Sequence, residues 1–69
     1  MDLLMIRGLI VAKYRTVKAF AHRIGYGESQ LSKLLTGKAK WTQEIIAAFI
    51  DALEIPLEDV GNIFFGQKS

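Results

Sequence analysis

The sequence predicts an all-α fold of five short helices, and three observations support this prediction. Apolar residues recur at intervals of three and four positions, which is the spacing of one face of a helix. Glycine residues and the single proline divide the chain into segments of helical length, and strand-like alternation is weak. With 69 residues the chain is long enough for one small core, so we expect a single domain over residues 1–69.

The composition is typical of a folded protein in a reducing compartment. Hydrophobic residues make up 51% of the chain and charged residues 23%, which is too apolar for a disordered segment. Because there is no cysteine, disulfides and thiolate metal clusters are excluded. The longest apolar stretches, 3–6 and 9–12, are far shorter than the roughly 18 residues of a membrane span. We therefore expect a cytoplasmic protein without a membrane segment.

The first helix is predicted over residues 3–13. Its core-facing stripe consists of Leu3, Ile6, Ile10 and Tyr14, with Leu4 and Val11 beside it. A second apolar stripe lies on the far side and consists of Met5, Leu9 and Ala12. Because a solvated helix does not need a second apolar stripe, this one is a candidate contact surface.

Two helices over 17–24 and 28–35 follow, each with a capping residue before it. Thr16 can accept a hydrogen bond from an early backbone N–H of the second helix, and Gly25 can end that helix with a positive φ. Gly27 precedes the third helix. The apolar residues expected to pack together are Val17, Phe20, Ala21, Ile24, Leu31, Leu34 and Leu35. A helix-turn-helix requires a small residue where its helices cross and favours a glycine at the turn, and this pair has both.

The last two helices are predicted after Thr42 and over residues 57–63. Thr42 is positioned to cap the fourth helix, which contributes most to the core. Its core-facing residues are Ile45, Ile46, Phe49, Ile50 and Leu53. Pro56 fits the start of the fifth helix, and Phe64 and Phe65 either extend that helix or form a short strand.

Charge is unevenly distributed along the chain. Residues 1–41 carry eight basic side chains and two acidic ones, whereas residues 42–69 carry one basic and five acidic side chains. Such asymmetry in one small domain indicates a basic face for a polyanion and an acidic face turned away from it. The alternative is that these charges serve solubility alone.

Three segments match motifs of one known family. Residues 16–21, Thr-Val-Lys-Ala-Phe-Ala, are similar to the Thr-Gln-x-x-Leu-Ala that opens the family's second helix. Residues 31–38, Leu-Ser-Lys-Leu-Leu-Thr-Gly-Lys, are similar to its Leu-Ser-x-x-Leu-Asn-Gly-Lys at the end of the third helix. Residues 52–55, Ala-Leu-Glu-Ile, are similar to the Ala-Leu-Gly-Ile that closes its fourth helix. Residues 6–65 therefore resemble the lambda-repressor-like helix-turn-helix domains of phage repressors and Cro proteins.

The sequence departs from the family pattern at three places. Val17 replaces a glutamine that contacts a phosphate in many relatives. Arg15 stands where a glycine often ends the first helix, so we expect a residue other than glycine with a positive φ there. Tyr26 and Gly27 replace an apolar residue and a serine, so the third helix lacks a hydroxyl cap.

The resemblance implies a compact five-helix lambda-repressor-like domain whose second and third helices form the helix-turn-helix. It also implies a transcriptional regulator in the cytoplasm of a bacterial host cell that binds a double-stranded DNA operator. With helix 28–35 in the major groove, the base-reading residues would be Glu28, Ser29, Gln30, Ser32 and Lys33. The phosphate-contacting residues would be Arg15, Lys18, Lys38, Lys40 and Thr42. Trp41 is expected to cover the core rather than stack on the DNA backbone.

The protein is expected to bind its operator as a homodimer, formed in solution or only on DNA, because one recognition helix reads only a few base pairs. Two surfaces are candidates for the dimer interface. We favour Phe64 and Phe65 over the surface of Met5 and Leu9, because in relatives the segment after helix four approaches the two-fold axis. The alternative for the phenylalanine pair is that it fills the bottom of the core.

No set of residues suggests catalysis. His22 has neither a cysteine nor a second histidine to share a metal, and no nucleophile with a base or phosphate-binding loop can be assembled. We therefore expect no enzyme activity, metal, cofactor or small-molecule ligand. A Cro-like regulator is favoured because 69 residues leave no room for a sensor domain. The alternatives are an antitoxin-type module on the same fold and a structural helical interaction module that does not bind DNA.

Overall fold

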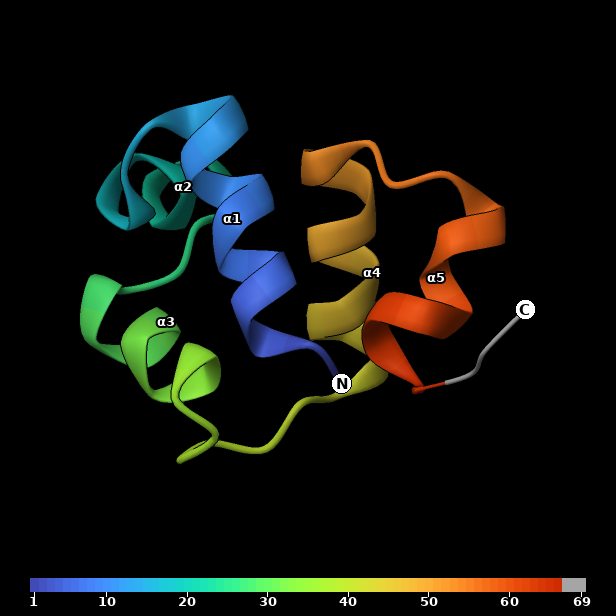
Figure 1. The fold of residues 1–69 in the computed structure, drawn as a ribbon. Coiled ribbons are helices and arrows are strands. Elements are labelled where there is room, and N and C mark those ends of the chain that lie inside the picture. The colour runs from blue at the N-terminus through green and yellow to red at the C-terminus, as the bar shows by residue number, and fades with distance from the viewer. Residues whose placement is uncertain (67–69) are drawn as a thin grey trace.

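Four helices surround a central α1 in the computed structural model, which describes residues 1–66 (Figure 1). The helices are α1 (Leu3–Tyr14), α2 (Val17–Ile24), α3 (Glu28–Leu35), α4 (Gln43–Leu53) and α5 (Leu57–Phe64). α1 contacts each of the others, with α2 and α3 on one side and α4 and α5 on the other (Figure 1). No strand occurs within residues 1–66, so the all-α prediction is confirmed. None of these helices has both the length and the apolar character that crossing a membrane requires.

Side-chain caps fix the starts of three helices. Thr16 Oγ1 accepts a hydrogen bond from the backbone N–H of Ala19 at 3.0 Å, and Thr42 Oγ1 accepts one from Ile45 N–H at 3.2 Å. Asp2 Oδ1 caps α1 by accepting from the backbone N–H three residues ahead, also at 3.0 Å. Each cap satisfies a donor that has no partner within the helix, and the caps predicted at Thr16 and Thr42 are confirmed.

One apolar core joins all five helices. Its buried residues are Ile6, Ile10, Phe20, Ala21, Leu31, Leu34, Leu35, Ile45, Phe49, Ala52, Leu53, Ile55, Ile63 and Phe64. Edge-to-face aromatic pairs with ring centroids between 4.7 and 6.0 Å apart run through it in the order Tyr14, Phe20, Phe49, Trp41, Phe64. Trp41 Nε1–H donates to the Leu34 carbonyl oxygen at 3.1 Å, which holds the indole over the core as predicted.

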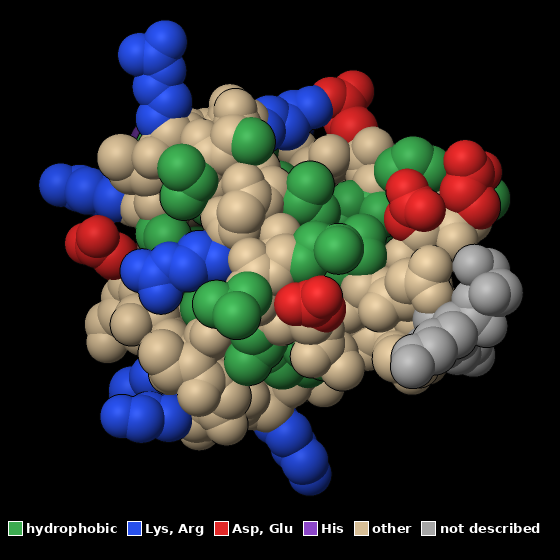
Figure 2. All heavy atoms as spheres, viewed as in Figure 1, with side chains coloured by type: hydrophobic (Ala, Val, Ile, Leu, Met, Phe, Trp, Pro, Cys, Tyr) green, Lys and Arg blue, Asp and Glu red, His purple; other side chains and the backbone are tan. Residues whose placement is uncertain are grey.

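The predicted core stripe of α1 is confirmed, but two residues expected beside it are exposed. Ile6 and Ile10 are completely buried, whereas Leu4 is 85% exposed and Val11 48%. Successive residues of a helix are rotated by about 100°, so Leu4 lies beyond the edge of the buried stripe, where its side chain faces solvent. Figure 2 shows apolar side chains gathered across this side of the molecule.

α5 extends one residue beyond its predicted end and includes Phe64. Phe64 is 3% exposed and packs edge-to-face on Trp41, whereas Phe65 is 59% exposed and is the C-terminal cap of the helix. The short strand considered for these two residues is therefore excluded. Phe64 is also removed from the candidate dimer surface, because the core of a single chain already covers it.

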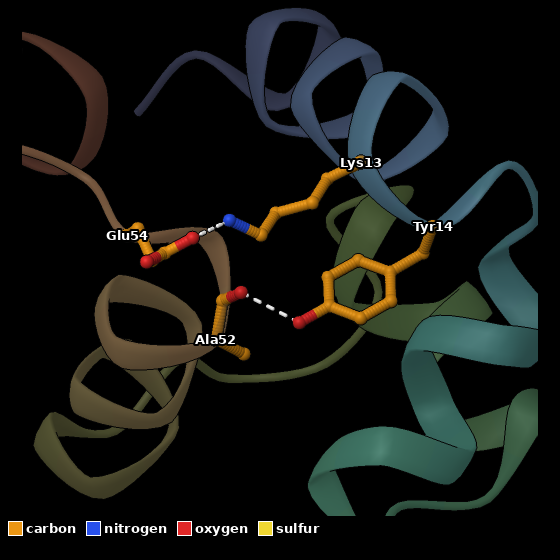
Figure 3. A network of polar contacts seen from close by, with 4 residues as sticks. All are labelled: Lys13, Tyr14, Ala52 and Glu54. Atoms are coloured by element: carbon orange, nitrogen blue, oxygen red, sulfur yellow. Dashed lines mark hydrogen bonds and ion pairs between the residues drawn. The ribbon is translucent and has the colours of Figure 1, made fainter.

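Two contacts tie the C-terminal end of α1 to that of α4 (Figure 3). The Tyr14 hydroxyl donates to the Ala52 carbonyl oxygen at 2.6 Å, and the Lys13 ammonium pairs with the Glu54 carboxylate. Arg15 and Glu54 follow the two helices with φ values of 73° and 53°. The positive φ predicted at Arg15 is confirmed. Glu54 stands where the motif of the lambda-repressor-like domains that the sequence resembles has a glycine, and its backbone adopts a conformation that favours glycine.

Candidate nucleic-acid interface

α2 and α3 form a packed pair joined by three residues. Gly25 ends α2 in the left-handed conformation with φ 77°, and Tyr26 N–H donates to the Ala21 carbonyl oxygen at 2.9 Å. Ala21 is 2% exposed. A small buried residue in the first helix, a left-handed glycine at the turn and a second helix three residues later are the local features of a helix-turn-helix.

The outward face of α3 is polar throughout. All five residues predicted to read bases are exposed, and they are Glu28, Ser29, Gln30, Ser32 and Lys33. The inward face consists of Leu31, Leu34 and Leu35, which are buried. Gly27, at the N-cap, adds no side-chain hydrogen bond to the first turn. α3 therefore presents its first turn and its polar side chains to solvent, and the core fixes its orientation.

Hydrogen bonds hold the segment after α3 against that helix. Thr36 Oγ1–H donates to the Ser32 carbonyl oxygen at 2.9 Å. The backbone N–H groups of Lys38 and Ala39 both donate to the Lys33 carbonyl oxygen, at 2.8 and 3.2 Å. These bonds bring the backbone of Lys38 to the C-terminal turn of α3, so basic residues of this loop border the polar face.

Every arginine and lysine predicted to contact phosphates is exposed. Arg15 lies directly after α1 and Lys18 in the first turn of α2, while Lys38 and Lys40 lie in the loop before α4. Thr42 also borders this loop, but its hydroxyl oxygen already accepts the capping bond of α4, so only its O–H remains to contact a phosphate oxygen.

The charged side chains separate into a basic side and an acidic side. In Figure 2, Lys and Arg predominate over α2 and α3, whereas Asp and Glu predominate toward α5. The helical ranges of α4 and α5 contain no basic residue, and their acidic residues are Glu44, Asp51, Glu58 and Asp59. Glu28 is the single acidic residue within α2 and α3. The asymmetry along the sequence thus corresponds to opposite sides of α1.

Arg7 lies at this surface although sequence reasoning did not assign it a role. It is exposed, and it lines a hollow together with Val17, Glu28, Ser29, Ser32 and Leu35. Arg7 belongs to α1, so motifs confined to the second and third helices did not point to it. In the sequence, Arg7 could be connected with DNA binding only as one of the eight basic residues of the segment 1–41.

A second hollow lies on the α2 side of the interface. It is lined by Thr16, Lys18, Ala19, Ala21, His22, Tyr26 and Glu28. His22 is exposed there, next to a lysine, which suits an imidazole close to a phosphate. Within residues 1–66, no group of three or more His, Cys, Asp or Glu side chains is placed to hold a metal ion.

The two candidate dimer surfaces adjoin each other. Met5 is 50% exposed and Leu9 is half-buried, and both line a hollow with residues of α5. The backbone N–H of Asp2 donates to the carbonyl oxygen of Ile63 at 2.8 Å, which ties the start of α1 to the end of α5. Exposed Phe65 is therefore near the start of α1, and the surfaces form neighbouring parts of one region.

Comparison with known proteins gives one family. A family model described as a protein of unknown function (DUF739) matches residues 1–67, a range that includes all five helices. No curated protein matches the sequence. Since this description names neither a ligand nor an activity, the geometry of α3 and the basic residues around it bears most directly on function.

Proposed function

The chain belongs to the family described as a protein of unknown function (DUF739), and we propose that it is a sequence-specific DNA-binding transcriptional regulator of the phage repressor or Cro type. The observation that carries the proposal is the exposed polar face of α3, bordered by basic side chains from α1, α2 and the loop before α4. A merely solvated helix needs no such border. A recognition helix in the major groove has phosphates on both sides, and basic residues there supply affinity.

Base reading falls to the N-terminal half and outer face of α3. Lys33 can donate to guanine O6 and N7, and Glu28 can accept from the amino group of cytosine. Ser29 can donate or accept. Because the buried leucines fix the rotation of α3, these three side chains approach a duplex from the same exposed face.

Arg7 supplies a phosphate contact that lambda-repressor-like domains make through a glutamine at the start of the second helix. Val17 lacks the amide of the glutamine that contacts a phosphate in relatives, but it lines the same hollow as Arg7. The guanidinium of Arg7 offers donors and positive charge at this point. It also offsets the negative charge of Glu28, which would otherwise oppose the phosphates.

The first test is binding of the full chain to duplex DNA over a salt gradient, followed by selection of bound sites from a random library. We expect the logarithm of the affinity to fall linearly with the logarithm of salt, by about 0.9 per phosphate neutralised, and the selected sites to share a motif. A reporter gene behind that motif then tests regulation. Salt-independent or absent binding would overturn the proposal.

Variants of Arg7 separate a DNA contact from a general loss of charge. We expect Arg7→Gln to weaken binding to all duplexes and to reduce the salt slope by about one. Lys13→Gln removes the same charge from α1 at a side chain that pairs with Glu54, away from α3, and is the matched control. Equal losses for the two variants would show that only net charge matters, and would exclude a local role for Arg7.

A protein-interaction module is the second candidate, favoured by exposed apolar residues. Leu57 is 88% exposed and Phe65 59%, and both lie at the α5 end, away from α3. Single exposed apolar residues are common on soluble proteins, so this observation carries less weight than the α3 face. Failure of the salt-gradient test would leave this candidate as the better explanation.

A further inference from the structure

α1 carries apolar residues on the side that faces solvent as well as on the side that faces the core. The solvent side holds three large exposed residues, Leu4, Met5 and Val11, which are 85%, 50% and 48% exposed. Gly8 and Ala12 lie between and beside them and are also exposed. A helix that packs in one core usually has a polar opposite face, and none of these residues belongs to the buried core of the single chain.

Gly8 lies at the centre of this set. Because glycine has no side chain, the helix backbone is uncovered at this point. A Cβ built at Gly8 finds no atom within 4 Å outside its own helix and chain neighbours, so the space above it is open. Leu4 precedes Gly8 by about one turn and Val11 follows it by about one turn. A second helix can therefore approach the backbone at Gly8 while the larger side chains pack on either side.

We propose that this face of α1, defined by Leu4, Met5, Gly8, Val11 and Ala12, binds the same face of a second copy in antiparallel orientation. The two-fold axis passes between the two Gly8 residues. Because Leu4 and Val11 lie at similar distances from Gly8, Leu4 of one copy then meets Val11 of the other. Met5 meets Ala12 in the same way.

Charges at the ends of α1 favour the antiparallel arrangement. Asp2 caps the start of the helix with an exposed carboxylate, and exposed Arg15 follows its end. No acidic residue lies between them. An antiparallel pair brings Asp2 of each copy toward Arg15 of the other and opposes the two helix dipoles, whereas a parallel pair brings like charges together.

This contact goes beyond the proposed DNA-binding function and does not depend on it. The exposed face of α1 shares no residue with the exposed polar face of α3, which consists of Glu28, Ser29, Gln30, Ser32 and Lys33. Two chains can therefore associate through α1 while each α3 stays accessible. Arg15 is the one residue that we assign both to the contact between two α1 helices and to the DNA-binding surface, where it was predicted to contact a phosphate.

Cysteine cross-linking tests the geometry directly, because the chain has no cysteine of its own. On mild oxidation without DNA, we expect Gly8→Cys to form a covalent dimer at least tenfold faster than Ala47→Cys, an exposed control on α4. A mixture of Leu4→Cys and Val11→Cys chains should form the mixed dimer in preference to either homodimer. Cross-linking of Gly8→Cys at the rate of the control, or no preference in the mixture, would overturn the proposal.

Gly8→Gln tests the same contact without a cross-linking reaction. A Cβ at this position meets no atom within 4 Å outside its own helix backbone and chain neighbours, and glutamine replaces a poor helix former, so the Tm should stay equal or rise. Self-association measured by sedimentation equilibrium should weaken at least tenfold. Ala47→Gln is the control and should leave it unchanged. A Gly8→Gln protein that associates as the parent does would refute the proposal, and because DNA is absent this result would leave the proposed function intact.

Discussion

Replacing Ala21 by leucine tests the packing on which the α2–α3 pair depends. Ala21 is 2% exposed, so neighbouring atoms cover its methyl group, and its carbonyl oxygen accepts the turn-closing bond from Tyr26 at 2.9 Å. Leucine places an isobutyl group where a methyl group fits, and such overpacking costs about 1–3 kcal/mol. Each kcal/mol lowers the Tm of a domain of this size by about 4–8 °C, so we expect a decrease of about 4–24 °C.

Thermal unfolding followed by circular dichroism measures this effect, with Ala19→Leu as the matched control. Ala19 belongs to the same helix but is exposed, so the same substitution should change stability by about 0.5 kcal/mol or less. Specific DNA binding by Ala21→Leu should fall as well, because α3 is displaced relative to α2. If both variants unfold at the parent temperature, Ala21 is not at a close helix crossing and the placement of the motif is wrong.

Three further predictions concern single side chains. Lys33→Ala should relax base preference at one operator position and cost about 1–3 kcal/mol on the best site, whereas Lys38→Ala should weaken all duplexes alike and reduce the salt slope by about one. Equal losses of Lys33→Ala on specific and random DNA would contradict base reading. Tyr14→Phe removes the donor to Ala52 and should destabilise the fold by about 0.5–1.5 kcal/mol in denaturant unfolding; an unchanged midpoint would refute a stabilising hydrogen bond. The parent should bind a full operator as two chains and more tightly than a half-site; one chain per duplex with equal affinities would contradict a DNA-bound dimer.

Features set by local interactions could be predicted from the sequence. The ends of α2 and α3, and the starts of α1 and α4, depend on residues within a few positions of each other, such as Thr16, Gly25 and Thr42. The same holds for the buried stripe of α1, because helical spacing alone places Ile6 and Ile10 together. The positive φ of Arg15 was predicted from the glycine at this helix end in the lambda-repressor-like domains that the sequence resembles.

Features that depend on how helices pack could not be predicted from spacing. Leu4 and Val11 are apolar and close to the buried stripe in sequence, but whether a second helix covers them depends on the directions of α2 and α5. Phe64 and Phe65 are identical and adjacent, and only the folded structure shows that Phe64 is the ring that packs on Trp41 and joins the core. Arg7 joins the candidate interface for the same reason, because α1 packs against α3.

The central position of α1 explains its buried apolar residues but not its exposed ones. A helix that contacts four others needs apolar side chains over more of its circumference than a surface helix, which explains Leu3, Ile6, Leu9 and Ile10. It does not explain Leu4 and Val11, which are 85% and 48% exposed, or Gly8 between them, which lowers helix stability by about 1 kcal/mol relative to alanine. Polar residues at these positions would give a more stable and more soluble single chain. Because the exposed face combines bulky apolar residues with an open centre, close packing against another helix explains it better than any requirement of the isolated fold.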